Sequence, residues 1–242
     1  PSSVLAIQIC MMSMAKKVLR SHMRNVLKGI SSQEIQTQSQ QISTQLQSII
    51  SNSKCSTSTA RKIGCFLSMD QGEVDTRYIL EWLFHPSETN KEVTSRVFLP
   101  RCTTTEETGQ IKLREDHSTG QPIDHPHLTF HEGDSLEIIK SWKPQGNYQL
   151  REPPFEMPPP LPPLMDIMIV PGVAFNLQNG ARMGWGAGYY DDFFRRYNLV
   201  HNSRPLLIGV ALKEQIVTQI DLEPHDQFMD CIVVGDGSIH WI

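Results

Sequence analysis

Cysteine is scarce in this chain and never occurs in the paired spacing of a disulfide framework or a zinc site. Cys10, Cys55, Cys65, Cys102 and Cys231 are scattered over 242 residues without a CxxC pair. This distribution is typical of ordinary thiols in a reducing compartment. It therefore argues against both a disulfide-stapled fold and a structural zinc ion.

The chain also lacks long apolar runs and an excess of positive charge. No hydrophobic segment reaches the length of a membrane span. The formal net charge is −4, which argues against an extended nucleic-acid-binding surface. With 39% hydrophobic and 20% charged residues, the composition suits one globular α/β domain. We therefore expect neither a membrane nor a nucleic acid as a partner.

Acidic residues are missing from the start of the chain, where Glu34 is the first. The cations that precede it are Lys16, Lys17, Arg20, Arg24 and Lys28. An acid-free basic start is typical of a mitochondrial transit peptide. The apolar spacing nevertheless predicts an amphipathic helix over 15–28, so these cations can equally belong to the folded protein. On such a helix Lys16 and Arg20 share a face and can reach one anion together.

The most informative stretch is 180–191, which reads GARMGWGAGYYD. It follows an apolar run at 166–175 and precedes a predicted helix at 190–197. Glycines at alternate positions let successive backbone N–H groups converge on a phosphate, and the helix start adds the positive end of its dipole. Asp191, in the first helical turn, is placed to face a metal ion on that phosphate. The order of these features predicts an anion site.

Phosphate-binding loops of other classes do not fit this stretch. A Walker A loop needs Gly-Lys-Ser/Thr, which is absent after these glycines, and Tyr189 stands where the dinucleotide fingerprint needs its third glycine. A tight loop whose glycines only pack is the remaining alternative. Composition alone leaves both interpretations open.

Strand and helix patterns alternate along the chain. Buried-strand patterns lie at 63–67, 97–99, 166–170, 206–211 and 231–234. Helical patterns lie at 15–28, 32–49, 76–83, 135–142 and 190–197. We expect Pro100 to end the second strand. This alternation predicts an α/β fold with a mainly parallel sheet covered by helices, a three-layer α/β/α arrangement.

Residues 171–175 and 182–191 together resemble the signature of the 5-formyltetrahydrofolate cyclo-ligase family, also called 5,10-methenyltetrahydrofolate synthetases, and especially its fungal forms. Further similar blocks follow in the family's order, at 15–20, 67–69, 72–74, 98–101, 112–114 and 230–233. The resemblance begins near Met14, so it predicts one domain over 14–242 after an extension over 1–13. It implies the sugar-phosphate isomerase/CoA-transferase-like fold and a monomer. A cytoplasmic location is expected, with mitochondria as the alternative.

The resemblance implies a reaction: ATP- and Mg²⁺-dependent cyclisation of 5-formyltetrahydrofolate to 5,10-methenyltetrahydrofolate, with release of ADP and phosphate. No protein nucleophile is implied. Arg182 and Tyr190 are candidate positioning groups. A non-catalytic sensor of nucleotides or phosphometabolites on the same fold is the alternative hypothesis.

The resemblance also implies which residues bind each ligand. Those matching ATP-binding positions are Lys16, Lys17, Val18, Leu19, Arg20, Arg182, Met183, Gly184, Trp185, Gly186, Ala187, Gly188, Tyr189 and Tyr190. Those matching folate-binding positions are Arg20, Met69, Glu73, Trp185, Gly186, Ala187, Gly188, Tyr189 and Tyr190. A carboxylate at Glu73 suits the neighbouring N–H groups of a pterin ring. Asp191 and Asp230 match the Mg²⁺ ligands, and two carboxylates with phosphate oxygens are normal magnesium chemistry.

The glycine loop departs from the family pattern at two positions. Many members carry Gly-Arg-Gly-Lys-Gly, whereas this chain has Trp185 and Ala187 at the basic positions. Backbone N–H groups can still hold phosphate, with Arg182 and the N-terminal lysines supplying charge. We therefore expect weaker nucleotide affinity and retained activity.

Overall fold

The computed structural model describes residues 3–53, 60–69, 72–85, 94–116, 118–145, 150–154 and 164–242, with side chains described from Met14 onward. Its helices are α1 (Ser3–Lys28), α2 (Ser32–Asn52), α3 (Arg77–Phe84), α4 (Thr105–Thr108), α5 (Leu136–Ser141), α6 (Tyr189–His201) and the 3₁₀ helix η2 (Lys213–Gln215). Its strands are β1 (Ala60–Gly64), β2 (Thr94–Thr104), β3 (Pro126–Glu132), β4 (Pro144–Gln145), β5 (Leu150–Arg151), β6 (Ile167–Val170), β7 (Ala174–Phe175), β8 (Arg182–Met183), β9 (Leu206–Ala211), β10 (Cys231–Val234) and β11 (Ile239–Trp241).

The centre of the fold is a seven-stranded sheet in the order β11-β10-β9-β6-β1-β2-β3. Neighbours from β10 through β2 pair in parallel. The two edge strands, β11 and β3, pair antiparallel with their neighbours. A mainly parallel α/β sheet was predicted, and this is confirmed. The sequence patterns missed both antiparallel edges.

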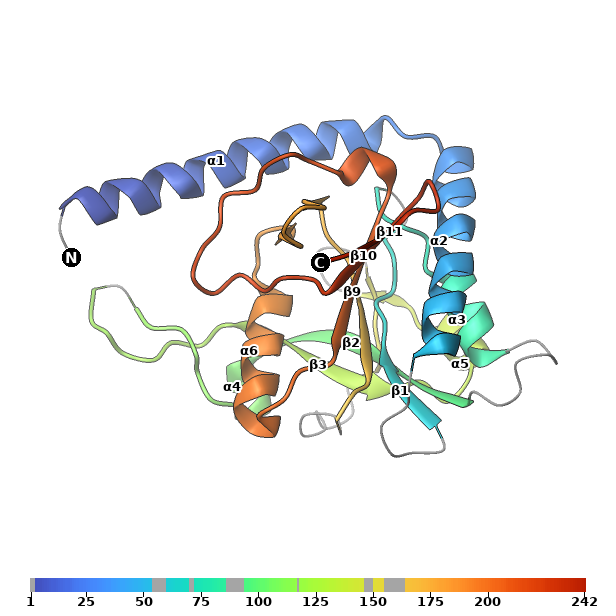
Figure 1. Cartoon of the computed structure of the whole chain (residues 1–242). Helices are drawn as coiled ribbons and strands as arrows, with labels where there is room; N and C mark the ends of the chain where they lie inside the picture. The colour runs from blue at the N-terminus through green and yellow to red at the C-terminus, as the bar shows by residue number, and fades with distance from the viewer. Residues whose placement is uncertain are drawn as a thin grey trace.

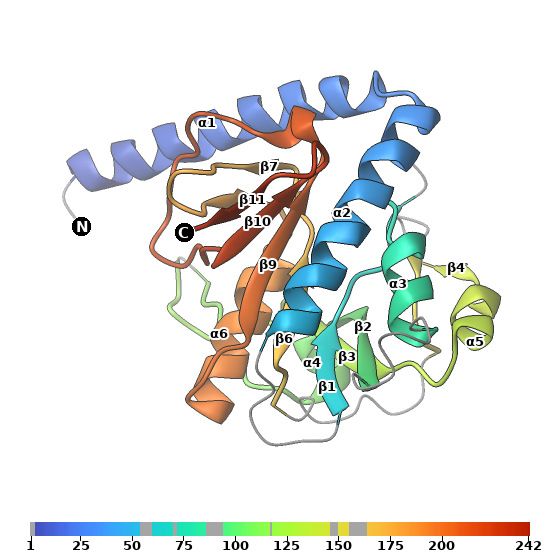
Figure 2. The same ribbon diagram turned by 45° about the vertical axis from the view of Figure 1, so that its right-hand side comes forward.

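Both faces of the sheet are buried, because successive strand residues point in opposite directions. In β6, Ile167 and Ile169 join the cluster that contains the apolar residues of α2 and α3. Met168 and Val170 join the other cluster, which holds the aromatic residues of α6. Helices accordingly cover opposite sides of the sheet (Figure 1, Figure 2). Burial on both faces explains why these strands read as continuous apolar runs.

Strand β2 corrects one expectation, because it does not end at Pro100. It continues to Thr104, pairing with β3 over its second half. Its last partner on the other side is Gly64, the final residue of β1, opposite Phe98. Beyond Phe98, that side of β2 is therefore an edge. A proline there loses no ladder hydrogen bond.

Helix α1 lies apart from the sheet faces. It contacts η2, which follows the carboxyl end of β9, and Figure 1 shows it crossing that end of the molecule. Its backbone is helical from Ser3, within the segment that we expected to precede the domain. The predicted cap of α2 is observed: Ser31 Oγ accepts the Glu34 N–H at 3.2 Å. Over the described residues, no helix has the length and apolarity needed to cross a membrane.

Candidate active site

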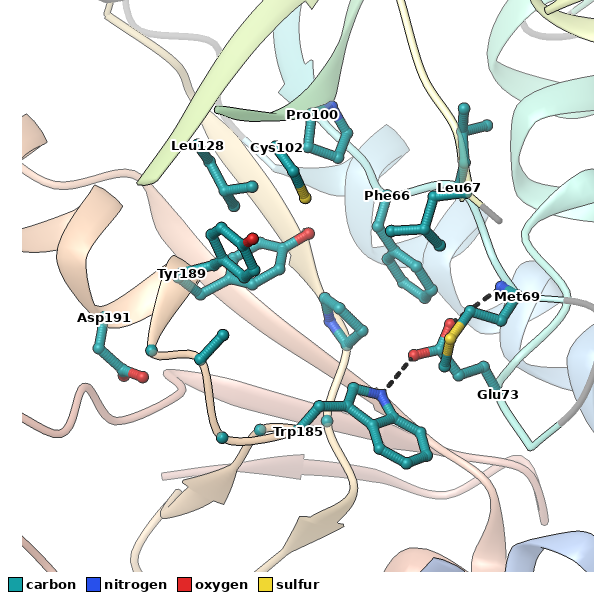
Figure 3. A pocket seen from close by; sticks show the side chains of 18 of the residues that line it. Phe66, Leu67, Met69, Glu73, Pro100, Cys102, Leu128, Trp185, Tyr189 and Asp191 are labelled. Atoms are coloured by element: carbon teal, nitrogen blue, oxygen red, sulfur yellow. Dashed lines mark hydrogen bonds between the residues drawn. The ribbon is translucent and has the colours of Figure 1, made fainter. Parts of the chain in front are cut away.

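A pocket opens at the carboxyl ends of the parallel strands. Open α/β sheets bind their ligands at this edge. One wall is the glycine loop with the start of α6, and the opposite wall comes from the ends of β1 and β2 (Figure 3). The predicted site residues that line it are Met69, Glu73, Arg182, Gly184, Trp185, Gly186, Ala187, Gly188, Tyr189, Tyr190 and Asp191.

The glycine loop adopts a conformation that requires its glycines. Gly186 has φ +115° and Gly188 has φ +70°, both in the region that other residues avoid. Gly188 is the N-cap of α6, and its carbonyl accepts the Asp192 N–H at 3.1 Å to close the first turn. The N–H groups of that turn have no partner within the helix, so they are available to an anion. The packing-only interpretation explains the tight turn but not the placement of this turn in a pocket.

Arg182 is a buried cation next to the glycine loop. Arg182 is only 5% exposed, and its Nη2 donates to Asp191 Oδ1 at 2.9 Å. Its guanidinium also lies 5.7 Å from the centre of the Tyr190 ring. Burial raises the pKa of Tyr190 well above its usual value, so its hydroxyl stays protonated. Arg182 Nε is buried and has no hydrogen-bond partner in the described part of the chain. The cluster therefore holds one more donor than the protein itself uses.

Glu73 forms the other polar end of the pocket. One of its carboxylate oxygens accepts the Trp185 Nε1–H at 3.0 Å and the other accepts the Met69 N–H at 3.1 Å (Figure 3). Glu73 is 7% exposed, and burial raises its pKa, while the bonds from Trp185 and Met69 act in the opposite direction. Arg24 stacks on the outer side of Trp185, with its guanidinium carbon 5.5 Å from the ring centre. Trp185 thus joins the glycine loop to the carboxylate.

Helix α1 brings one of its predicted ligands to the loop. Arg20 Nε donates to the Gly184 carbonyl at 3.1 Å. Lys16 shares that face but is 5% exposed and ion-paired, at 2.7 Å each, to Glu223 and Asp226. Lys17 and Val18 are exposed. The shared face of Lys16 and Arg20 is confirmed, whereas only Arg20 touches the glycine loop.

Three other predicted residues lie outside the pocket lining. Leu19 packs against the hydrophobic core, and Met183 is buried in it. Asp230 opens β10, where its carboxylate accepts the Leu207 N–H at 2.8 Å and pairs with Arg204. Leu207 belongs to the amino end of β9, so Asp230 lies at the edge of the sheet opposite the pocket. The structure does not bring the two predicted metal ligands together.

Several pocket residues were not predicted as ligand contacts, although some of them belong to the family-like blocks. They are Phe66, Leu67, Pro100, Cys102, Leu128, Leu150, Arg151, Glu152, Pro171 and Gly172. Most are apolar residues at strand ends, which sequence patterns assign to the core. Burial and the nearby carboxylate of Glu152 raise the pKa of the Cys102 thiol to about 12, so it stays protonated. The Glu152 carboxylate also accepts the Cys102 N–H at 3.0 Å.

The fold and the pocket define an α/β protein in which a glycine loop and a helix start border a mostly apolar pocket. Comparisons with known proteins identify the family to which this chain is similar. The model of the 5-formyltetrahydrofolate cyclo-ligase family matches residues 12–235. The 5-formyltetrahydrofolate cyclo-ligase of Saccharomyces cerevisiae is 45% identical over 227 residues, covering 93% of this chain and 98% of that protein. The Mus musculus enzyme of the same name is 28% identical, covering 92% and 95%.

This chain therefore belongs to the 5-formyltetrahydrofolate cyclo-ligase family, and the resemblance read from the sequence is confirmed. A solved structure has a similar fold: the 5,10-methenyltetrahydrofolate synthetase of Aquifex aeolicus, with a TM-score of 0.60 and 21% identity. The match covers 93% of this chain and 92% of that one.

Proposed function

We propose that this protein catalyses the ATP-dependent cyclisation of 5-formyltetrahydrofolate to 5,10-methenyltetrahydrofolate. One observation carries the proposal: a single pocket joins a glycine loop at a helix start to a buried carboxylate between apolar walls. The glycine loop at the helix start suits a triphosphate, and the carboxylate between apolar walls suits a pterin ring. The Saccharomyces cerevisiae relative bears the name of this activity.

The folate is expected to lie between Glu73 and the apolar wall. Phe66, Leu67 and Met69 offer flat apolar contact on the side where Glu73 stands (Figure 3). Each Glu73 oxygen accepts one protein N–H and keeps lone pairs for the adjacent N–H groups of the pterin. A charge-assisted pair of bonds of this kind fixes both position and orientation.

The nucleotide is expected to lie with its phosphates on the glycine loop and the start of α6. Arg20, which donates to the Gly184 carbonyl, and Arg182, which donates to Asp191, supply positive charge beside that loop. Asp191 fits a magnesium ion there: its Oδ1 binds Arg182 and the Gln227 N–H, which leaves its second oxygen for the metal. When bound, Mg²⁺ would neutralise charge on the phosphates. For Asp230, a metal role stays a prediction that would require this residue to leave Arg204 and Leu207 and to move toward the carboxyl ends of the strands.

The chemistry needs positioning rather than a protein nucleophile. The formyl oxygen attacks the γ-phosphorus and ADP leaves, so a poor leaving group becomes a phosphate ester. N10 then attacks the activated carbon, phosphate leaves with that oxygen, and N10 loses its proton. Holding the formyl oxygen in line with the phosphate is the main contribution expected of the protein. Arg182 neutralises charge that develops on the transferred group, and the protonated Tyr190 hydroxyl can donate to it.

Turnover tests this proposal and separates it from a sensor. Purified protein with 5-formyltetrahydrofolate and MgATP should form methenyl product, followed by its ultraviolet absorbance, with ADP released in equal amount. A sensor would bind either ligand and consume neither. Binding of both without product would overturn the proposed function.

Removal of the metal should abolish this turnover. The reason is the Asp191 carboxylate beside the phosphate loop. Excess EDTA should stop product formation, and added Mg²⁺ should restore it. Asp191→Asn should raise the Mg²⁺ concentration needed for half-maximal rate, with the folate KM little changed. Full activity in EDTA would contradict the magnesium role.

Glu73→Gln should mainly impair the folate side. Glutamine can accept at only one end of its amide, so its NH₂ must face the Trp185 N–H, the Met69 N–H or the pterin. We expect the folate KM to rise about tenfold or more, as for a lost charge-assisted bond, and the ATP KM to stay within about twofold. Asp75→Asn is the matched control, because Asp75 pairs with the exposed Arg77. A change in ATP kinetics alone would mean that Glu73 serves the nucleotide.

We also propose the finer points that the family suggests. The fold belongs to the sugar-phosphate isomerase/CoA-transferase-like group, with a three-layer α/β/α arrangement and one domain over 14–242. The protein acts as a monomer, which sedimentation can test. Its compartment is the cytoplasm, with mitochondria as the alternative, which imaging of the tagged protein can decide.

A further inference from the structure

Besides Arg20 and Arg182, a third arginine lies against the glycine loop, and the family resemblance assigned it no role. Arg114 Nη2 donates to the Ala187 carbonyl at 2.9 Å. A Cβ placed on Gly188 would meet that same nitrogen at 3.2 Å, so the guanidinium lies directly over the N-cap of α6. Within the described part of the chain, no carboxylate forms an ion pair with Arg114. Its charge is therefore presented to the helix start rather than neutralised.

The segment that carries Arg114 is fixed to α6 from several directions. Arg195 Nη1 donates to the Leu113 carbonyl at 3.2 Å, and Arg196 Nη1 donates to the Ile111 carbonyl at 2.7 Å. The Leu113 N–H in turn donates to His125 Nε2 at 2.9 Å. Arg196 is itself paired with buried Asp192, one turn earlier on α6, at 3.1 Å. These bonds fix the segment that carries Arg114 to α6, and the Arg114 guanidinium reaches from it to the helix start.

Arg114 lies close to the part of the glycine loop that lacks the basic residues found in many family members. Trp185 and Ala187 occupy positions where many family members have cations. In space, Arg20 contacts the loop at Gly184, its first glycine, and Arg114 contacts it at Ala187 and Gly188, its end. Because Arg20 already matches a family position, Arg114 is the additional arginine, and it lies beside the position of the missing cation at 187. An arginine fork suits phosphate oxygens better than a point charge, because it can donate two parallel bonds.

We propose that Arg114 is a phosphate-binding residue, which contacts the triphosphate of the nucleotide at the Gly188 end of the loop. It replaces, from a different segment, the charge that the loop itself lacks. This inference rests on the proposed function for the identity of the nucleotide. It does not depend on turnover, because it concerns a polyphosphate bound at the start of α6.

Binding of MgATP and of inorganic tripolyphosphate, each measured by calorimetry on the full chain, tests the proposal. Arg114→Ala should weaken both at least about tenfold, as expected for loss of a charge-assisted bond, and leave 5-formyltetrahydrofolate binding unchanged. Arg114→Lys should recover part of the loss, since it keeps the charge but not the fork. Lys112→Ala is the matched control: it removes the same charge from an exposed side chain two residues away and should change binding less than twofold.

The outcomes separate this inference from the proposed function. If the wild-type protein binds MgATP without forming product, the cyclo-ligase proposal fails, and the Arg114 comparison can still be made. If Arg114→Ala stays folded by circular dichroism and binds MgATP and tripolyphosphate as the wild type does, Arg114 is not a phosphate ligand. Equal losses in Arg114→Ala and Lys112→Ala would also overturn it, because they would indicate a general charge effect.

Discussion

Gly186→Val is expected to abolish detectable MgATP binding while leaving the fold in place. Gly186 has φ +115°, a conformation that a β-branched residue cannot adopt without strain. A Cβ there would lie 3.6 Å from the Arg20 guanidinium carbon, so we expect the additional methyl groups of valine to crowd that arginine. The backbone strain should cost on the order of 1–2 kcal/mol of stability. Calorimetry measures the binding and circular dichroism the fold.

Gly109→Val is the matched control for this variant. Gly109 has φ +64° at the end of α4, and a Cβ there would meet no atom within 4 Å. It should therefore show a similar loss of stability with unchanged nucleotide binding. A folded Gly186→Val protein that binds MgATP as the parent does would mean that the glycine loop is not the nucleotide site.

Arg182→Ala is expected to lower kcat at least about 100-fold, the typical effect of losing one pre-positioned charge donor. It should also cost about 2–3 kcal/mol in the free energy of unfolding. The full penalty for an unpaired buried charge is about 3–5 kcal/mol. The cost here is smaller because the Asp191 side chain stays 16% exposed and keeps its bond from the Gln227 N–H. Urea unfolding and steady-state kinetics give the two quantities.

Two further variants make this result interpretable. Arg182→Lys keeps the charge but loses the fork to Asp191 and the carbonyl of Pro171, so it should fold well and still show a reduced kcat. Arg96→Ala removes a comparable but exposed pair with Glu132 and should cost less than about 1 kcal/mol with normal kinetics. If Arg182→Lys has wild-type kcat, the geometry of Arg182 does not serve the reaction.

The central sheet was predictable because its strands are buried on both faces. Continuous apolar runs such as 166–170 and 206–211 have few other interpretations in a chain of this composition. Strand β3 escaped prediction because its sequence mixes histidines and threonines with apolar residues at an edge. Pro100 misled for a related reason: a proline ends a central strand, and the sequence cannot tell where the neighbouring strand stops.

The site was predictable where backbone conformation dictates residue type. Gly186 and Gly188 must be glycines, and a helix start must follow them. The ion pairs of Lys16 with Glu223 and Asp226 could not be foreseen, because they join segments more than 200 residues apart. The contact of Arg114 with the glycine loop was not predicted for the same reason. Its role depends on which loop packs beside α6, and local spacing carries no information on that.

The unequal lengths of β1 and β2 determine how large a molecule the site can admit. Because β2 runs on past Phe98 while β1 ends at Gly64, the edge exposed by this mismatch becomes a wall of the cavity, with Pro100 and Cys102 facing inward. The extent of this wall thus depends on where β1 ends as well as on the side chains that line the cavity. We expect an insertion that extends β1 by two residues to cover the free edge of β2 and to make the cavity smaller. We expect a deletion that shortens β1 to make the cavity larger. Ligand size on this scaffold can therefore be altered without touching the glycine loop.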